Sequence, residues 1–212
     1  MRLRLERVTA PQITPVTLAE AKQQLRLEPD QSDDDALITG LIATAVEQAE
    51  RWTGRALIRQ VWRMFLDAWP GEAPGNAWEG IREGPSSLIA PSPAEVWLAK
   101  LPLISVAHVK TYDDSDVASS WAPSNYVVDT ASEPGRIVPR KGASWPTPGR
   151  AANGIEIEFT AGYGANAHDV PEGIRQGILG MVEKLHDGCD PEDARKAAQA
   201  ETLWQAYRVL HL

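Results

Sequence analysis

Residues 32–54 read SDDDALITGLIATAVEQAERWTG and carry the clearest helix pattern in the chain. Ser32 is the expected N-cap, and the three aspartates after it place negative charge at the positive end of a helix dipole. Gly54 is a natural stop. One apolar stripe at helical spacing is formed by Leu37, Leu41, Ala45, Ala49 and Trp52, widened by Ile38 and Ile42. The stretch predicts a long amphipathic helix that needs a partner.

Two other segments offer matching helices. In VTLAEAKQQLRL, residues 16–27, Thr17 and Glu20 have the spacing of a capping box. In DVPEGIRQGILGMVEKLHDG, residues 169–188, an apolar stripe is accompanied by glycines on another face, where a second element could pack closely. We expect segments 17–53 and 171–187 to pack together and to bury Leu41, Ile42, Trp52, Ile178 and Leu185 in a common core.

The middle of the chain changes to the alternating pattern of half-buried strands. The clearest run is IEIEFT, residues 155–160, in which Ile155, Ile157 and Phe159 are expected to face inward, with Glu156 and Glu158 on the solvated face. Further strand-like runs lie at 57–69, 96–101, 105–112, 126–129 and 136–139. Residues 70–93 hold five prolines and four glycines and predict a long irregular excursion.

This order of elements predicts an α+β protein: a small α-helical bundle from the N- and C-terminal segments, with a β-rich insertion in the middle. We expect residues 1–56 to form the N-terminal helical part of the bundle and residues 57–165 the β-rich insertion. Residues 166–212 are expected to form the C-terminal helical part and the tail.

Charge and cysteine content restrict the possible functions. The formal net charge of -8 disfavours tight nonspecific binding to nucleic acid, because the average surface repels phosphates. Cys189 is the only cysteine, so neither a disulfide framework within the chain nor a Cys-rich zinc site is expected. No apolar run approaches the ~20 residues that span a bilayer, and the N-terminus lacks a signal-like apolar region, so no membrane partner is expected.

No recognisable constellation for catalysis or cofactor binding is present. His186 and Cys189 lack the further ligands that zinc needs, and Asp33, Asp34 and Asp35 are better explained as the first turn of a helix than as a cation site. Glu156 and Glu158 could serve as an acid–base pair, but solvated positions on a strand explain them more simply. We therefore expect no enzyme activity, no cofactor and no metal.

Residues 134–146, PGRIVPRKGASWP, raise the question of a binding loop. The segment does not suit a phosphate cradle, because its glycines are seven residues apart and a proline separates them. A short strand at 136–138, a turn at Lys141–Gly142 and a Trp145–Pro146 cap folded back on the sheet predict a hairpin with an exposed basic tip. Arg140, Lys141 and Trp145 are candidates for contacts with a partner.

Residues 190–212 form the second candidate interface. Asp190 as cap and Pro191 at the first position predict a last helix. Its apolar stripe is formed by Ala200, Leu203, Tyr207 and Leu210, with Trp204 beside it. Such a face either docks on a partner or folds back into the core of its own bundle, and the sequence leaves both open. Trp204, Tyr207 and Leu210 are the candidate anchors.

Several segments together resemble the phage head–tail connector (adaptor) family of long-tailed phages and gene transfer agents. They span roughly residues 13–185 and the closing YRVLHL. In chain order they are TLAEAKQQLRL, DDDALITGLIATAVEQAERWTGRAL, YVVDTASEPGRIVPRKGASWP, IEIEFTAGYG and VPEGIRQGIL. Their ordered combination carries the resemblance, whereas the excursion at 70–93 is not typical of the family.

The resemblance implies a virion structural protein of the particle neck, made in the cytoplasm of a bacterial host. It implies a homo-oligomeric ring, commonly of twelve copies, that sits under the portal protein and extends the channel for packaged and ejected double-stranded DNA without binding it tightly. The ring would receive a tail-side neck or stopper protein. The C-terminal region, with Trp204, Tyr207 and Leu210, would dock on the portal.

Two other functions stay open from the residues alone. The first is an acidic soluble enzyme with an unrecognised site, which a deep pocket with a perturbed titratable group would support. The second is a DNA-binding regulator that uses the N-terminal helices. Helix 32–54 is a poor reader of the major groove, because it carries five acidic residues and one basic residue, Arg51.

Overall fold

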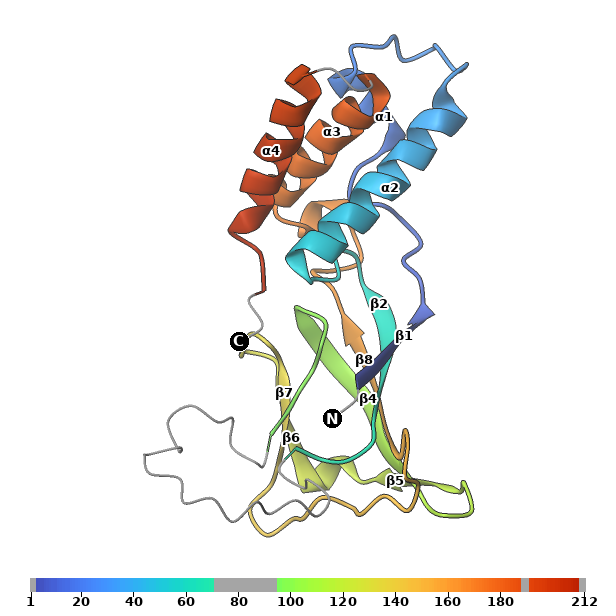
Figure 1. The fold of residues 1–212 in the computed structure, drawn as a ribbon, viewed down its shortest axis with the longest axis vertical. Coiled ribbons are helices and arrows are strands. Elements are labelled where there is room, and N and C mark those ends of the chain that lie inside the picture. The colour runs from blue at the N-terminus through green and yellow to red at the C-terminus, as the bar shows by residue number, and fades with distance from the viewer. Residues whose placement is uncertain (1–2, 71–94, 188–190, 210–212) are drawn as a thin grey trace. The chain divides into compact units, whose positions relative to one another are not determined.

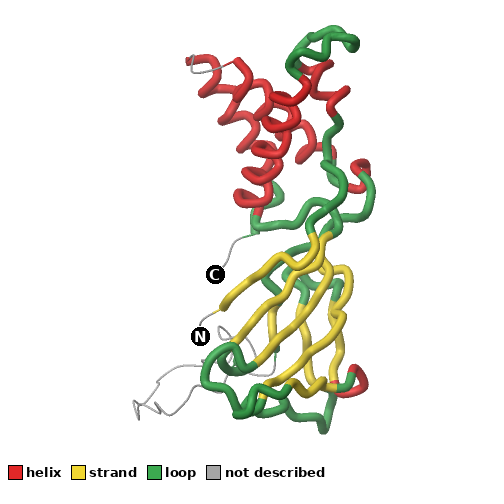
Figure 2. Tube along the Cα trace, turned by 90° about the vertical axis from the view of Figure 1, so that its right-hand side faces the viewer, coloured by secondary structure: helices red, strands yellow, loops and turns green. Residues whose placement is uncertain are grey.

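The computed structural model describes residues 3–70, 95–187 and 191–209 of the 212-residue chain, and it contains both helices and sheets (Figure 1). The predicted α+β class is confirmed. Figure 2 distinguishes the helical parts of the chain from the strands. The irregular excursion predicted at 70–93 lies, apart from Pro70, outside the described residues.

The chain divides into two compact units. The β-rich unit comprises Met1–Thr9 and Val61–Ala161, and the helical unit comprises Ala10–Gln60 and Gly162–Leu212. Residues 3–9 form a strand of the β-rich unit, although the sequence analysis placed residues 1–56 in the helical part. Arginines and a glutamate are interspersed with leucines and valine in this segment, and four of its seven side chains are charged or polar, which conceals an edge strand.

The helical unit contains α1 (Leu18–Gln24), α2 (Asp35–Thr53), α3 (Glu172–Asp187), α4 (Pro191–Gln205) and a 3-10 turn, η3 (Ala167–Asp169). The predicted capping box at Thr17 and Glu20 is confirmed. Helix α2 ends at Gly54, whose φ of 74° is the left-handed conformation expected of a glycine cap. Its N-cap is Asp34 rather than Ser32.

The core of the helical unit forms where α2 and α3 pack together, as predicted. Ile42 and Ile178 are buried, and Leu41 and Leu185 are half-buried at its edge. The prediction for Trp52 is wrong: this side chain is 36% exposed and lies under the Arg208 guanidinium, 5.4 Å from the ring centroid. The buried face of α2 keeps Ile38, Ile42, Ala45 and Ala49 of the predicted stripe, but it ends at Thr53 rather than at Trp52.

The β-rich unit contains two sheets. In the five-stranded sheet the order is β1 (Leu3–Thr9), β2 (Gln60–Leu66), β8 (Ile155–Ala161), β4 (Leu103–Tyr112) and β5 (Ala118–Trp121). In the three-stranded sheet it is β3 (Val96–Trp97), β7 (Arg136–Pro139) and β6 (Tyr126–Asp129), and a 3-10 turn, η2 (Pro123–Asn125), precedes β6. Strands β1 and β5 were not predicted, because β5 reads ASSW and has no apolar alternation.

Strand β8 runs between β2 and β4 and provides much of the core of this unit. Ile155, Ile157 and Phe159 are fully buried, as predicted. The prediction that Glu156 is solvated is wrong, because its side chain is only 5% exposed. Charged and polar side chains from β2 and β4 converge on it, which a single-strand pattern cannot reveal. Glu158 is half-buried on the same face.

Candidate functional site

Glu156 is the centre of a polar cluster on the five-stranded sheet. Its carboxylate accepts a hydrogen bond of 2.6 Å from the Tyr112 hydroxyl and lies 2.9 Å from His108 Nε2. Arg63 Nε, on β2, is 3.4 Å from the same carboxylate, and Lys110 Nζ, on β4, is 3.9 Å away. Arg63 also donates to Glu158 at 2.8 Å. The cluster therefore links β2, β8 and β4.

These contacts determine the protonation states of Glu156 and Tyr112. Burial alone would raise the pKa of Glu156, but hydrogen bonds with Tyr112 and His108, together with the charge of Arg63, leave this pKa below its usual value. The pKa of Tyr112 is raised by its hydrogen bond to Glu156 and by burial. At neutral pH the carboxylate is therefore ionised and the phenol is protonated.

The cluster contains ligand types that could hold a metal ion. Ligand atoms of His108, Glu156 and Glu158 lie within 4.8 Å of one another. However, the Arg63 guanidinium binds both carboxylates, so a cation would have to compete with a charge that is already in place. The contacts are those of a charge-balanced network that joins three strands, and they do not favour a metal centre.

The basic loop that follows β7 has the predicted turn. Ala143 N donates to Arg140 O at 2.9 Å, and Gly142 has a φ of 87°, so Arg140–Ala143 forms a tight turn with glycine at its left-handed position. Arg140 and Lys141 are exposed and form no ion pair with a described residue. The predicted hairpin consists of β6 and β7, and its own turn lies at 130–135, so the basic tip is at the other end of β7.

The third candidate in this loop, Trp145, belongs to an aromatic cluster and is only half-exposed. It stacks on Trp69 with ring centroids 4.1 Å apart, and Trp121 lies 4.9 Å from it. The Trp69 indole donates to Pro146 O at 2.7 Å, and Trp121 stacks on Tyr126. Trp145–Pro146 is therefore folded back on the sheet, as predicted, and holds the loop that presents Arg140 and Lys141.

Two of the three candidate C-terminal anchors, Trp204 and Tyr207, pack against α3, whereas anchors of a free interface would be exposed. Trp204 is 1% exposed, and its indole donates to Ile174 O at 3.2 Å. It lies directly over Gly177, where a Cβ would collide with the indole ring. Tyr207 is half-buried beside Gly173. Trp204 and Tyr207 thus fill the space left by the α3 glycines, which is the core alternative, and Leu210 lies outside the described residues.

The chain after α4 is tied to the end of α2. Arg55 Nε donates to Tyr207 O at 2.8 Å, and Val209 N donates to Thr53 O at 3.0 Å. These bonds fix the segment through residue 209 against its own unit. Leu203, at 43% exposed, is the large apolar residue of α4 that remains accessible.

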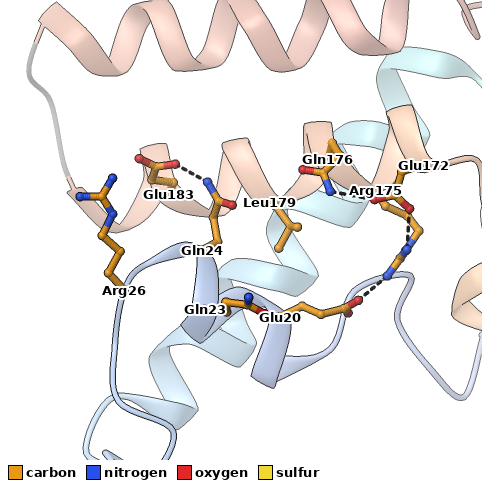
Figure 3. Close-up of a pocket in the computed structure, with 9 residues that line it drawn as sticks. All are labelled: Glu20, Gln23, Gln24, Arg26, Glu172, Arg175, Gln176, Leu179 and Glu183. Carbon is orange, nitrogen blue, oxygen red and sulfur yellow. Dashed lines mark hydrogen bonds and ion pairs between the residues drawn. The ribbon is translucent and has the colours of Figure 1, made fainter.

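A polar pocket of about 500 Å³ lies between α1 and α3 (Figure 3). Arg175 connects the two helices, because it binds Glu172 at 2.6 Å and also pairs with Glu20 of the α1 capping box. Gln24 of α1 donates to Glu183 of α3 at 2.8 Å and forms a second link between the two helices. Burial opposes ionisation of Glu20, but hydrogen bonds from Thr17 and the charge of Arg175 leave its pKa below its usual value. The pocket was not predicted, because its walls are 150 residues apart in sequence.

The described residues give no support to the two other metal sites considered, at Asp33–Asp35 and at His186 with Cys189. Asp35 forms an ion pair of 2.5 Å with the buried Lys22, which also donates to Gln31 O at 2.7 Å and so holds the loop before α2. Cys189 and Asp190 lie outside the described residues, and His186 contacts the adjacent Asp187. Among the helices that the structure describes, none is long and apolar enough to cross a membrane.

The chain is similar to a known family in part of its sequence and to solved structures in its fold. Residues 15–82 match the family model of the phage gp6-like head-tail connector protein. No curated protein sequence matches the chain. The resemblance to head–tail connectors inferred from the sequence is confirmed.

The similar solved structures are chains of gene transfer agent (GTA) particles. A chain in the neck of an empty GTA particle computed with C6 symmetry has a TM-score of 0.72 and 22% identity, over 99% of this chain and 97% of that one. A chain in the virion of a native GTA particle gives 0.73 and 21%, over 98% and 96%. A chain in the neck of a native GTA particle computed with C12 symmetry gives 0.71 and 21%, over 99% and 97%. This chain therefore shares their fold along nearly its whole length.

Proposed function

We propose that this chain is a head–tail connector subunit that forms a ring in the neck of a virion or phage-like particle. The observation that carries the proposal is the fold, which matches GTA neck chains over 99% of the chain, together with the connector match at residues 15–82. The necks were computed with C6 and C12 symmetry, which supports a ring. We propose twelve copies, seated under the portal and receiving a tail-side stopper protein.

A structural role fits the chemistry of the described residues better than an enzymatic one. The pKa of Glu156 and that of Glu20 are both lowered, so these carboxylates are held ionised by fixed partners rather than poised to transfer protons. The pocket between α1 and α3 is crossed by the Arg175 ion pairs. The proposal therefore includes no catalytic step and no cofactor.

The proposal assigns different roles to the two units. The helical unit, with the α4 segment, contacts the portal, and the β-rich unit forms contacts around the ring. Because Trp204 and Tyr207 are committed to the core, the portal contact is assigned to the outer face of α4, with Leu203 at its centre, and to the tail that includes Leu210. Arg140 and Lys141 are proposed as contacts with a neighbouring protein.

We expect Leu203→Asp to weaken co-sedimentation with the portal of the same particle roughly tenfold or more, because it places a charge in an apolar contact. Leu203 is exposed, so the melting temperature should not change. Leu37→Asp, at a leucine on α2 that is 55% exposed, is the matched control and should leave binding intact. If the Leu203→Asp variant binds the portal normally, the docking face lies elsewhere on the chain. If the wild-type chain never binds the portal, the connector function is contradicted.

We also expect the isolated chain to bind duplex DNA weakly or not at all near physiological salt. The reason is its net charge of -8, because the average surface repels the phosphates of the duplex. Fluorescence anisotropy with labelled duplex DNA measures the affinity. Submicromolar binding at that salt would favour the DNA-binding regulator instead.

A further inference from the structure

The five-stranded sheet has two edge strands, β1 and β5, each of which pairs on one side only among the described residues. Strand β1 is seven residues long, contains no proline and carries exposed apolar side chains at Leu3 and Val8. The β4–β5 turn carries a third at Val117, which is 59% exposed. Long accessible edges of this kind are usually protected in monomeric proteins, because their backbone groups pair readily with another chain.

The β1 edge is basic. Arg4 lies over the Phe65 ring, with its guanidinium carbon 5.9 Å from the centroid, and Arg7 lies over Trp62 at 6.0 Å. Stacking on these β2 aromatics holds both guanidinium groups on the strand while their own residues stay exposed. The one acidic residue of the strand, Glu6, is opposite Arg63 in the β1–β2 register.

The turn that leads into the β5 edge is acidic, whereas β5 itself carries no charge. This turn between β4 and β5 carries Asp113, Asp114 and Asp116, all exposed, and Asp116 pairs with Arg150 at 3.0 Å. Asp113 fixes the turn by accepting bonds of 2.9 Å from Ser115 N and Val117 N. The turn is also supported from behind, because Gly149 lies so close that a Cβ there would be 2.5 Å from Asp114 N. The backbone of the turn is therefore held in place around the exposed Asp114.

The basic and acidic features lie at the same end of the sheet, on opposite edges. Leu3 is opposite Leu66 at the end of β2, and the adjacent Asp67 accepts a bond of 2.9 Å from Asn153 N. Gly154 O then accepts from Tyr112 N, the last residue of β4, which is opposite Ala118. These successive contacts connect the start of β1 to the acidic turn across the end of the sheet.

We propose that the β1 edge of one copy docks on the β5 edge and acidic turn of the next copy, with Arg4 and Arg7 facing Asp114 and its neighbours. The proposal rests on the proposed function, since it names the contact that builds the ring. A contact between two different edges is head-to-tail, the class of contact that forms a ring when its rotation closes, as a connector requires. A two-fold contact of β1 with β1 would instead bring two arginine-bearing edges together.

Charge reversal tests the contact. Arg4→Glu places acidic side chains at both contact positions, 4 and 114, and Asp114→Lys places basic side chains at both, and each alone is expected to form rings on the portal roughly tenfold less readily. A 1:1 mixture of the two variants is expected to restore ring formation, because every contact in an alternating ring is again between opposite charges. The double variant should recover for the same reason. Failure of both the mixture and the double variant to recover would overturn the proposal.

Crosslinking identifies which edges meet. In a Cys189→Ser background, Arg4→Cys and Asp114→Cys chains carrying different tags are mixed on the portal and treated with a short bis-maleimide. We expect products that join the two variants, whereas products that join two Arg4→Cys chains would show a two-fold contact and overturn the proposal. Absence of any product in assembled rings would also overturn it. If the wild-type chain forms no ring at all, the proposed function itself fails.

Discussion

Replacing Trp204 with Ala is expected to lower the free energy of unfolding of the helical unit by about 3–5 kcal/mol. The indole is 1% exposed, donates to Ile174 O and fills the space above Gly177. Truncation would leave a large cavity between α3 and α4, because the glycine opposite has no side chain that could move into it. The effect should be among the largest for any single side chain of this unit.

Chemical denaturation followed by far-ultraviolet circular dichroism measures this loss, since the helical unit dominates that signal. Leu203→Ala is the matched control: it is the preceding residue, is 43% exposed, and should change stability little. A Trp204→Ala protein that unfolds like the wild type but no longer binds portal would restore Trp204 as a docking anchor.

The same contacts determine the expected result of a C-terminal truncation. Deleting residues 199–212 removes Ala200 and Trp204 from the core and breaks the bonds from Arg55 to Tyr207 and from Val209 to Thr53. The shortened chain should therefore lose the fold of its helical unit. A deletion of this kind cannot separate portal binding from folding, whereas the Leu203 variant can.

Glu156→Ala is expected to lower the free energy of unfolding of the β-rich unit by about 3–5 kcal/mol, because it leaves Arg63, His108 and Tyr112 without their shared partner inside the sheet. Glu158→Gln is the matched control on the same strand. It is half-buried and loses only the pairing with Arg63, so its effect should be smaller. Tryptophan fluorescence can follow this unit through the stacked pair Trp69 and Trp145.

The pH dependence of stability gives a second measurement at this residue. Because the pKa of Glu156 is lower in the folded state than in the unfolded chain, its contribution is fully present above its unfolded value of about 4.5. The contribution is lost as the pH falls through the folded pKa. The difference in stability between wild type and Glu156→Gln should therefore shrink in acid, and a difference that grew as the pH fell would contradict the ionised assignment.

Local signals in the sequence predicted much of the fold. The Thr17–Glu20 capping box, the Gly54 stop and the alternation of Ile155, Ile157 and Phe159 depend on neighbours within a few residues, and each was found as expected. The predicted stripe on α2 was too wide, because Leu37 and Ile38 are both apolar and only the packing of the helix decides that Ile38 is buried and Leu37 exposed.

The polar cluster and the C-terminal core could not be predicted in this way. Glu156 looks like a solvated strand residue until the register of β4 brings His108 and Tyr112 beside it. Trp204 could be a docking anchor or a core residue until Gly177, 27 positions earlier in the chain, is recognised as the space it fills. Both depend on tertiary contacts between segments that are distant in sequence.

Cryo-electron microscopy of the chain mixed with the portal of its own particle tests the central claim most directly. We expect a closed ring of these subunits stacked under the portal and coaxial with its channel, with neighbouring copies in contact through the two edges of the five-stranded sheet. Portal particles that stay bare at saturating protein, or subunits bound singly at scattered positions without a ring, would contradict it.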